Sequence, residues 1–366
     1  MVNKVVNEQF WQGKRVFITG HTGFKGSWLT IWLNSLGAKV TGYACLPPTS
    51  PNLFELSDIG LQMNSVIGDI RDRELLKQRV EEADPDIIFH LAAEPLVRRS
   101  YLYPAETYEV NVMGTVNLME AVRSLAAHGS GRRRAIINIT TDKCYENKEW
   151  LWGYRENDRL GGHDPYSNSK ACSELVTAAY RSSFFSPELV DQHGVSIATT
   201  RAGNVIGGGD WAEDRLVPDC IRAILTGAMM KVRNPLATRP WQHVLDPLSG
   251  YLMLAERMMG DGQRYASSWN FGPNDGQSRT VGWIVETIAS SWGGEPFYRL
   301  EAKDEFHEAI QLRLDCSKAH AELNWYPKWR VETALDKVLE WVRAYRDGQD
   351  VLTICLNQLE TYNVSD

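Results

Sequence analysis

Cysteine is scarce in this sequence and follows no pattern. The chain of 366 residues has six cysteines. No two are spaced as C-x-x-C, and no cysteine and histidine residues are grouped at the spacing of zinc ligands. The pattern gives no support for a structural zinc or a disulfide framework, so we expect no bound metal and reduced thiols in a cytoplasmic protein. The cysteines are Cys45, Cys144, Cys172, Cys220, Cys316 and Cys355.

Long apolar runs and an excess of positive charge are also absent. No window approaches the roughly 20 apolar residues that a transmembrane helix needs. Residues 1–12 have neither the apolar run nor the cleavage pattern of a signal peptide. The net charge of −7 argues against a general nucleic-acid binder and against a membrane-surface protein. An anionic small ligand would therefore need a local group of basic residues.

Internal repeats and low-complexity linkers are missing as well, and what remains is an ordinary globular composition. Hydrophobic residues make up 43% of the chain and charged residues 23%, which is typical of a folded domain. The length allows one large domain or two linked lobes.

Strand and helix signals alternate through the first half of the chain, which favours βαβ units and an α/β fold with a parallel sheet. From about residue 204 the pattern changes to shorter elements and long loops rich in glycine, proline and tryptophan. We predict a main domain over 1–203 and a smaller substrate-binding lobe over 204–366, with a segment around 240–260 returning to the main domain. The predicted strands are 14–19, 38–43, 66–68, 86–91, 135–139 and 194–198, and the predicted helices include 73–83, 105–127 and 165–183.

A glycine-rich turn follows the first predicted strand. Gly20, Gly23 and Gly26 have the spacing G-x-x-G-x-x-G and stand immediately before an amphipathic segment. A strand, a glycine turn and a helix N-terminus together form the place where backbone N–H groups meet a pyrophosphate. Such a triplet alone is often only a loop, so its position between a strand and a helix carries the inference.

Tyr166 and Lys170 stand four residues apart in a predicted helix. They share one helix face, and a nearby ammonium group is predicted to lower the pKa of the phenol from about 10. A base closer to neutrality is what removal of an alcohol proton during hydride transfer requires. The same spacing occurs by chance in many exposed helices, so the pair gains its meaning from the glycine turn and from its place beyond the strand ends.

With these motifs in order along the chain, the sequence resembles the extended short-chain dehydrogenase/reductase family, and within it the nucleotide-sugar 4,6-dehydratases. Two segments, 141–145 and 238–244, look most like the branch that acts on CDP-glucose. The resemblance implies a Rossmann-like doubly wound sheet, NAD as cofactor and a role in deoxysugar precursor biosynthesis. The matching segments are 19–26, 68–70, 90–93, 111–115, 141–143, 166–170, 201–205, 272–274 and 314–318.

The resemblance also implies roles for the residues of the reaction. Tyr166 is the expected base for the sugar C4 hydroxyl, with Lys170 as its partner and Thr141 as a hydrogen-bond donor to the C4 oxygen. Asp142 is expected to protonate the leaving C6 hydroxyl and Lys143 to take the C5 proton. These roles need a raised pKa at the aspartate and a neutral amine at the lysine. Thr141 could instead be a turn hydroxyl and Lys143 an exposed cation or a phosphate contact.

For the cofactor, the resemblance implies contacts from the glycine turn and from the ends of two later strands. No acid follows the second predicted strand, where NAD-specific members usually have one, and neither an arginine nor a lysine stands there. Thr49 or Ser50 could substitute, and we predict weak retention of NAD. The expected cofactor residues are Gly20, His21, Gly23, Phe24, Lys25, Gly26, Asp69, Ile70, Leu91, Ala92, Ala93, Tyr166 and Lys170.

For the substrate, a diphosphate needs arginine side chains or helix N-termini. Arginines in the second half of the chain are the candidates, although most surface arginines are simply solvated. Trp211 and Trp241 could stack on a base, with ordinary packing as the alternative for each. The expected substrate residues are Arg201, Asn204, Arg215, Arg233, Arg239, Trp241 and Arg279.

Two other functions compete with a dehydratase. A nucleotide-sugar 4-epimerase or reductase would use the same Tyr166 and Lys170, but it has no need of the acid–base pair Asp142 and Lys143. A non-catalytic nucleotide-binding scaffold would most readily have lost Tyr166 or Lys170. The resemblance further implies a homodimer through a four-helix bundle, with a tetramer as the alternative, and no nucleic-acid or membrane partner.

Overall fold

A computed structural model gives the structure of the chain. It describes residues 6–128, 131–232, 234–274, 276–293, 297–300 and 312–365. Within these ranges, no helix has both the length and the apolar character needed to cross a membrane.

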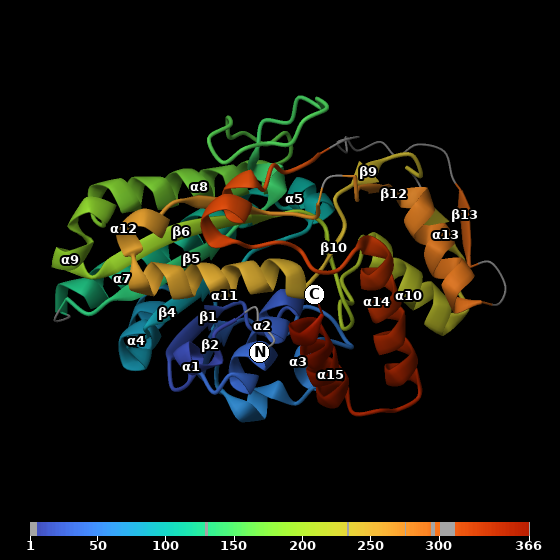
Figure 1. Cartoon of the computed structure of the whole chain (residues 1–366), viewed down its shortest axis with the longest axis horizontal. Helices are drawn as coiled ribbons and strands as arrows, with labels where there is room; N and C mark the ends of the chain where they lie inside the picture. Colours follow the sequence, from blue (N-terminus) through green and yellow to red (C-terminus); the bar gives the residue numbers. More distant parts are fainter. Residues whose placement is uncertain are drawn as a thin grey trace.

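The molecule is built on a seven-stranded sheet in the order β3-β2-β1-β4-β5-β6-β11, with every neighbouring pair parallel (Figure 1). The order reverses between β1 and β4, which creates the crevice where doubly wound folds bind their ligands. The predicted fold is therefore confirmed. The strands of this sheet are β1 (Arg15–Thr19), β2 (Lys39–Ala44), β3 (Asn64–Ile67), β4 (Ile87–His90), β5 (Arg134–Ile139), β6 (Val195–Ala202) and β11 (Ser268–Phe271).

Helices cover both faces of the sheet, so its central strands are buried on both sides. Alternate residues of a strand point to opposite faces: Phe17 belongs to the apolar cluster under α4 and α7, whereas Val16 and Ile18 belong to the cluster that includes α2 and α11. The helices of this part are α1 (Glu8–Trp11), α2 (Phe24–Ser35), α3 (Leu53–Leu56), α4 (Arg73–Ala83), α5 (Val97–Leu102), α6 (Pro104–Tyr108), α7 (Gly114–His128), α8 (Pro165–Ser183), α9 (Val190–His193), α11 (Leu245–Gly260), α12 (Gly262–Tyr265) and α15 (Val351–Val364). Short 3-10 or π-helical turns lie at Ile59–Gln62, Glu109–Met113, Asp142–Cys144, Pro187–Leu189 and Ala319–Leu323.

A smaller group of elements lies to one side of the sheet (Figure 1). Its three helices pack in a chain, α10 on α13 and α13 on α14. Its strands form three short pairs, β7 with β10, β8 with β13, and β9 with β12. These elements are β7 (Val205–Ile206), α10 (Leu216–Thr226), β8 (Met230–Val232), β9 (Thr238–Arg239), β10 (Gln242–His243), β12 (Arg279–Thr280), α13 (Val281–Trp292), β13 (Tyr298–Leu300) and α14 (Val331–Arg346).

The boundary between the main domain and the smaller lobe differs from the predicted one at β11. We assigned 204–366 mainly to the substrate lobe, but β11 pairs with β6 at the edge of the main sheet. This strand has only four residues, and the buried amide of Asn270 interrupts its apolar run, so the sequence pattern does not reveal it. The segment around 240–260 forms α11, which packs against β5 and β6.

Candidate active site

The turn after β5 carries three of the expected catalytic residues. Thr141 begins it, and its hydroxyl accepts a hydrogen bond from the Lys143 amide at 3.4 Å. The carboxyl group of Asp142 is buried, with Oδ1 accepting from the Thr141 hydroxyl at 3.1 Å and Oδ2 lacking any partner among the described residues. A Cβ at Gly203 would come within 2.9 Å of that oxygen, so this glycine leaves room for the carboxyl. Burial raises the pKa of Asp142, as a proton donor requires.

The N-terminus of α8 brings Tyr166 to the same turn. Asp164 caps the helix by accepting from the Ser167 amide at 2.9 Å, and Pro165 starts it. Tyr166 is 9% exposed, and its phenol is hydrogen-bonded to the Thr141 hydroxyl. This cap therefore fixes the phenol beside the threonine.

Lys170 lies one turn along α8 and is buried, and its Nζ donates to the Ile139 carbonyl at 3.2 Å. Burial lowers the pKa of this ammonium group to about 8, whereas Glu174 raises it. We expected Lys170 to lower the pKa of Tyr166, but the structure contradicts this. Burial raises the pKa of the phenol to about 12, because desolvation of the phenolate outweighs the opposing effect of the neighbouring Thr141 hydroxyl.

The glycine turn has the geometry of a dinucleotide cradle. Gly20 has φ +79°, and a Cβ there would lie 2.7 Å from the Ala92 nitrogen at the end of β4. A Cβ at Gly26 would lie 2.2 Å from the Gly20 carbonyl oxygen, so this residue lets α2 start tightly against the turn. Gly23 is the N-cap of α2 and leaves its first N–H groups without a side-chain acceptor. These groups and the helix dipole suit a pyrophosphate.

His21 and Lys25, two other expected cofactor residues of the turn, have side chains in different places. His21 was expected to touch phosphate or solvent, but its side chain is buried, 2.7 Å from the Ser65 hydroxyl and edge-on to the Phe54 ring. Burial lowers its pKa to about 4, so the ring is neutral near pH 7. Lys25, in contrast, lines the cavity that contains Tyr166. Burial lowers its pKa to about 8, and the charge of Arg215 acts in the same direction.

The remaining cofactor candidates lie at the carboxyl ends of β3 and β4 or on the turn. Asp69 was expected to accept from adenine, but Arg71 already donates to its two oxygens at 3.0 and 2.6 Å and lowers its pKa. Ile70 is buried and leaves no room for a side chain at Gly114. Thr49, proposed as a ribose contact, donates to the Pro51 carbonyl at 2.9 Å. Leu91, Ala92 and Ala93 follow β4 directly, and Phe24 abuts Gly207.

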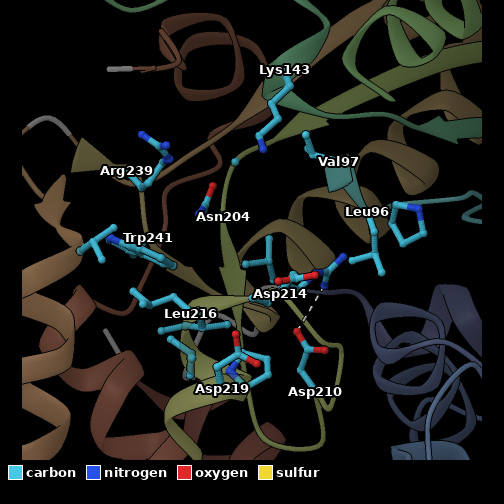
Figure 2. Close-up of a pocket in the computed structure, with 18 of the residues that line it drawn as sticks. Leu96, Val97, Lys143, Asn204, Asp210, Asp214, Leu216, Asp219, Arg239 and Trp241 are labelled. Atoms are coloured by element: carbon cyan, nitrogen blue, oxygen red, sulfur yellow. Dashed lines mark hydrogen bonds and ion pairs between the residues drawn. The ribbon is translucent and has the colours of Figure 1, made fainter. Parts of the chain in front are cut away.

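A cavity of about 310 Å³ joins the catalytic turn to the smaller lobe (Figure 2). The basic groups inside it are held by neighbours: Arg215 pairs with Asp210 at 3.2 Å, and Arg239 donates to the Thr238 carbonyl at 3.0 Å. This volume is at the lower end of the range for small-molecule sites. The expected residues that line it are Lys25, Thr141, Asp142, Lys143, Tyr166, Asn204, Arg215, Arg239 and Trp241. A second cavity adjoins it at Lys143, Asn204 and Arg239 and is otherwise formed mainly by the loop 145–164.

Two expected substrate arginines, Arg201 and Arg279, are not found in the cavity. Arg201 is 2% exposed in an ion pair with Glu174 at 2.8 Å, because β6 directs it into the interior. Arg279 pairs with Glu332 at 3.0 Å and stacks on the Trp283 ring. Arg233 lies outside the described residues. Trp211 packs edge-on against Tyr345 in the core, so it follows the packing alternative.

Sequence reasoning missed several cavity residues on the approach to α10 and within its first turn, together with a group at α5. Only the amphipathic start of α10 after Arg215 could have signalled them. They are Arg98, Asp210, Asp214, Leu216 and Asp219.

Comparisons with known proteins identify the family of the chain. Residues 17–338 match the family described as GDP-mannose 4,6 dehydratase. The chain is 51% identical to the CDP-glucose 4,6-dehydratase of Salmonella typhimurium over 98% of both chains. A crystal structure of dTDP-glucose 4,6-dehydratase from Bacillus anthracis in complex with NAD has a TM-score of 0.73 at 23% identity, covering 92% of this chain and 99% of that one. A crystal structure of UDP-glucose-4-epimerase from Stenotrophomonas maltophila with bound NAD has a TM-score of 0.77 at 20% identity, and the match covers 92% of this chain and 99% of that one. The chain belongs to the GDP-mannose 4,6 dehydratase family of nucleotide-sugar dehydratases.

Proposed function

We propose that the chain is an NAD-dependent CDP-glucose 4,6-dehydratase that converts CDP-D-glucose to CDP-4-keto-6-deoxy-D-glucose and water. One observation carries the proposal: a buried carboxyl with an unpaired oxygen, Asp142, stands between Thr141 and Lys143 in the cavity that also holds Tyr166. An epimerase would not need this acid–base pair. The 51% identity with a CDP-glucose 4,6-dehydratase supports the choice of nucleotide.

The first step is oxidation at C4 of the sugar. NAD, when bound, supplies the hydride acceptor and later the hydride donor, and the glycine turn with the free N-terminus of α2 would hold its pyrophosphate. Tyr166 takes the proton of the C4 hydroxyl, and Thr141 hydrogen-bonds the same oxygen. Lys170 lies one turn along the same helix face, with its Nζ held against the Ile139 carbonyl.

Elimination follows across C5 and C6. The C4 ketone acidifies the C5–H bond, and Lys143 takes that proton as a general base. The C6–O bond then breaks, and Asp142 gives its proton to the departing hydroxyl, which leaves as water. Hydride return to C6 and protonation at C5 complete the product, so the reaction has no net redox change.

Side chains in the middle of the cavity would bind the diphosphate. Arg215 and Arg239 carry the positive charge, and Asn204 offers an amide donor beside them. Asp210 orients Arg215 through the ion pair at 3.2 Å. These arginines form the local basic group that an anionic ligand needs in a chain with a net negative charge.

We also propose a homodimer, assembled through the helices around α7 and α8, in the cytoplasm. Large apolar side chains stand exposed on or next to these helices: Leu175 of α8 is 57% exposed, Met113 directly before α7 is 50% exposed, and Phe184 directly after α8 is 50% exposed. Such a patch favours an interface. All six cysteines are free thiols, as a reducing compartment favours. Sedimentation should give a dimer for the chain and a lighter species for Leu175→Arg; a chain that sediments as a monomer would contradict the assembly.

The reaction is tested by incubating the protein with CDP-glucose and NAD. We expect a 4-keto product that absorbs in alkali and that has lost one water by mass. Parallel reactions with dTDP-, GDP- and UDP-sugars test the choice of nucleotide. Absence of product from CDP-glucose, with product from another sugar nucleotide, would reject the proposal.

A further inference from the structure

The residues that line the cavity change from catalytic to basic and then to apolar along its length. This order matches the order of sugar, diphosphate and base in a nucleotide sugar. Lys143 and the catalytic turn lie at one end, and Asn204 and Arg239 follow (Figure 2). Leu216 and Trp241 lie further from Lys143 (Figure 2), and Met230 and Val232 are among the other apolar residues that line the cavity. If the proposed function holds, the sugar occupies the first part, the diphosphate the second and the pyrimidine base the third.

Asp219 lies at the end far from Lys143, next to Leu216 (Figure 2). It belongs to the first turns of α10, and its side chain is 31% exposed. Arg222, one turn along the helix, donates to Oδ1 at 2.6 Å and to the Trp211 carbonyl at 2.8 Å. Among the described residues, Oδ2 receives no hydrogen bond. The carboxylate is thus fixed by one oxygen while the other is available to a ligand.

The other charges around this carboxylate do not neutralise it further. Asp214 and Glu213 are acidic, and both raise its pKa in the same direction as burial, whereas Arg222 lowers it. Asp214 has its own partner, because Arg98 lies 3.3 Å from its Oδ1. The second oxygen of Asp219 is therefore an acceptor that a donor of the ligand, such as an amino group, can meet.

The geometry points to Asp219 as the residue that selects the base: we infer that its Oδ2 accepts a hydrogen bond from the exocyclic 4-amino group of cytosine. Cytosine presents a donor at this position, whereas uracil and thymine present a carbonyl acceptor. A carboxylate facing a carbonyl leaves two acceptors unpaired and repelling each other, which disfavours both competing pyrimidines. The enzyme would then reject UDP- and dTDP-sugars at the base, remote from the reacting carbons.

Binding of CDP and UDP to the protein tests this inference without catalysis. Asp219→Asn should weaken CDP by about tenfold or more and narrow its advantage over UDP, because one charged base contact is worth about one to two decades in affinity. In turnover, the variant should raise KM for CDP-glucose and keep most of kcat. Asp214→Asn is the matched control, since it removes one negative charge from the same cavity and should leave the CDP-to-UDP ratio unchanged.

A second measurement changes the ligand instead of the protein, so the test does not depend on the Asp219→Asn variant alone. The CDP analogue with hydrogen in place of the 4-amino group should bind the unmodified protein about tenfold more weakly than CDP, and should bind Asp219→Asn with little further loss. Such non-additivity would locate the contact. Equal losses in both proteins, or an unchanged CDP-to-UDP ratio in Asp219→Asn, would overturn the inference. Failure of the proposed function would look different, as an unmodified protein that binds CDP but does not dehydrate CDP-glucose.

Discussion

At the scale of single residues, the surroundings of Asp142 and Lys143 support their proposed roles as proton donor and base. Asp142 is buried with one oxygen unpaired among the described residues, and burial raises its pKa, which is the direction that a proton donor requires. Lys143 reaches into the cavity and also borders the adjoining one. Two neighbours in sequence thus line the same cavity, as the proposed roles of proton donor and base require.

Replacing Lys143 by methionine should lower the rate of product formation about 100- to 10,000-fold, the usual contribution of one acid–base group. Oxidation at C4 does not need this amine, so transient NADH absorbance should still appear on adding CDP-glucose. Lys148→Met is the control, because Lys148 also borders the adjoining cavity but pairs with Glu146. Unchanged turnover in Lys143→Met would reject the assignment of this lysine as the base.

Residues whose positions are set by the local backbone could be placed in the cavity from the sequence. Residues whose side chains depend on distant partners could not. Thr141, Asp142, Tyr166 and Lys25 reach the cavity because strand ends and helix N-termini place them there. The side chains of His21 and Arg201 do not line the cavity, because they meet Ser65 and Glu174 in the interior, and nothing in the local sequence shows these contacts. The pKa of Tyr166 was misjudged for the same reason: the spacing shows its neighbour but not its burial.

At the scale of elements, the buried pair of Arg201 and Glu174 joins β6 to α8. Glu174 also accepts from Thr140 at 2.5 Å and from Thr199 at 2.7 Å, and Arg201 donates to the Tyr145 hydroxyl at 2.7 Å. Thr140 and Tyr145 flank the catalytic turn on its two sides. This network therefore fixes that turn between the strand and the helix.

Arg201→Met should lower the free energy of unfolding by about 3–5 kcal/mol, because it leaves the Glu174 carboxylate buried without a partner. The double variant Arg201→Met/Glu174→Met should recover much of this loss, since no unpaired charge remains. Urea titrations followed by circular dichroism measure both. A loss in Arg201→Met below about 1 kcal/mol, or a double variant less stable than the single one, would show that the pair does not join these elements.

Elements with strong local signals were predicted to the residue, and those fixed by distant packing were not. The predicted helices 73–83 and 165–183 coincide with α4 and α8, where Asp72 and Asp164 cap the first turns. The predicted helix 105–127 is broken by the π-helical turn Glu109–Met113. In this turn the buried Asn111 binds the Glu94 backbone and Ser169 of α8, contacts that no periodicity reveals.

At the scale of the whole molecule, the C-terminal helix closes onto the main domain. α15 packs on α2, and the Tyr362 hydroxyl donates to Oδ1 of the buried Asp246 at 2.9 Å. The Lys328 amide donates to the same oxygen at 2.8 Å. One carboxyl of α11 therefore ties the last helix and the segment before α14 to the core of the sheet domain.

This carboxyl makes the stability of the whole fold depend on pH. Burial raises the pKa of Asp246 to about 7, so the folded chain holds a proton that the unfolded chain loses near pH 4. The stabilisation is complete below about pH 4 and falls as pH rises through about 7, by roughly 1.4 kcal/mol for each unit of the shift. Asp246→Asn keeps an acceptor for Tyr362 and Lys328 but cannot ionise. Relative to the unmodified chain, it should therefore gain stability between pH 5 and 8 in urea titrations. A difference between the two proteins that does not change over this range would show that Asp246 is ionised in the fold.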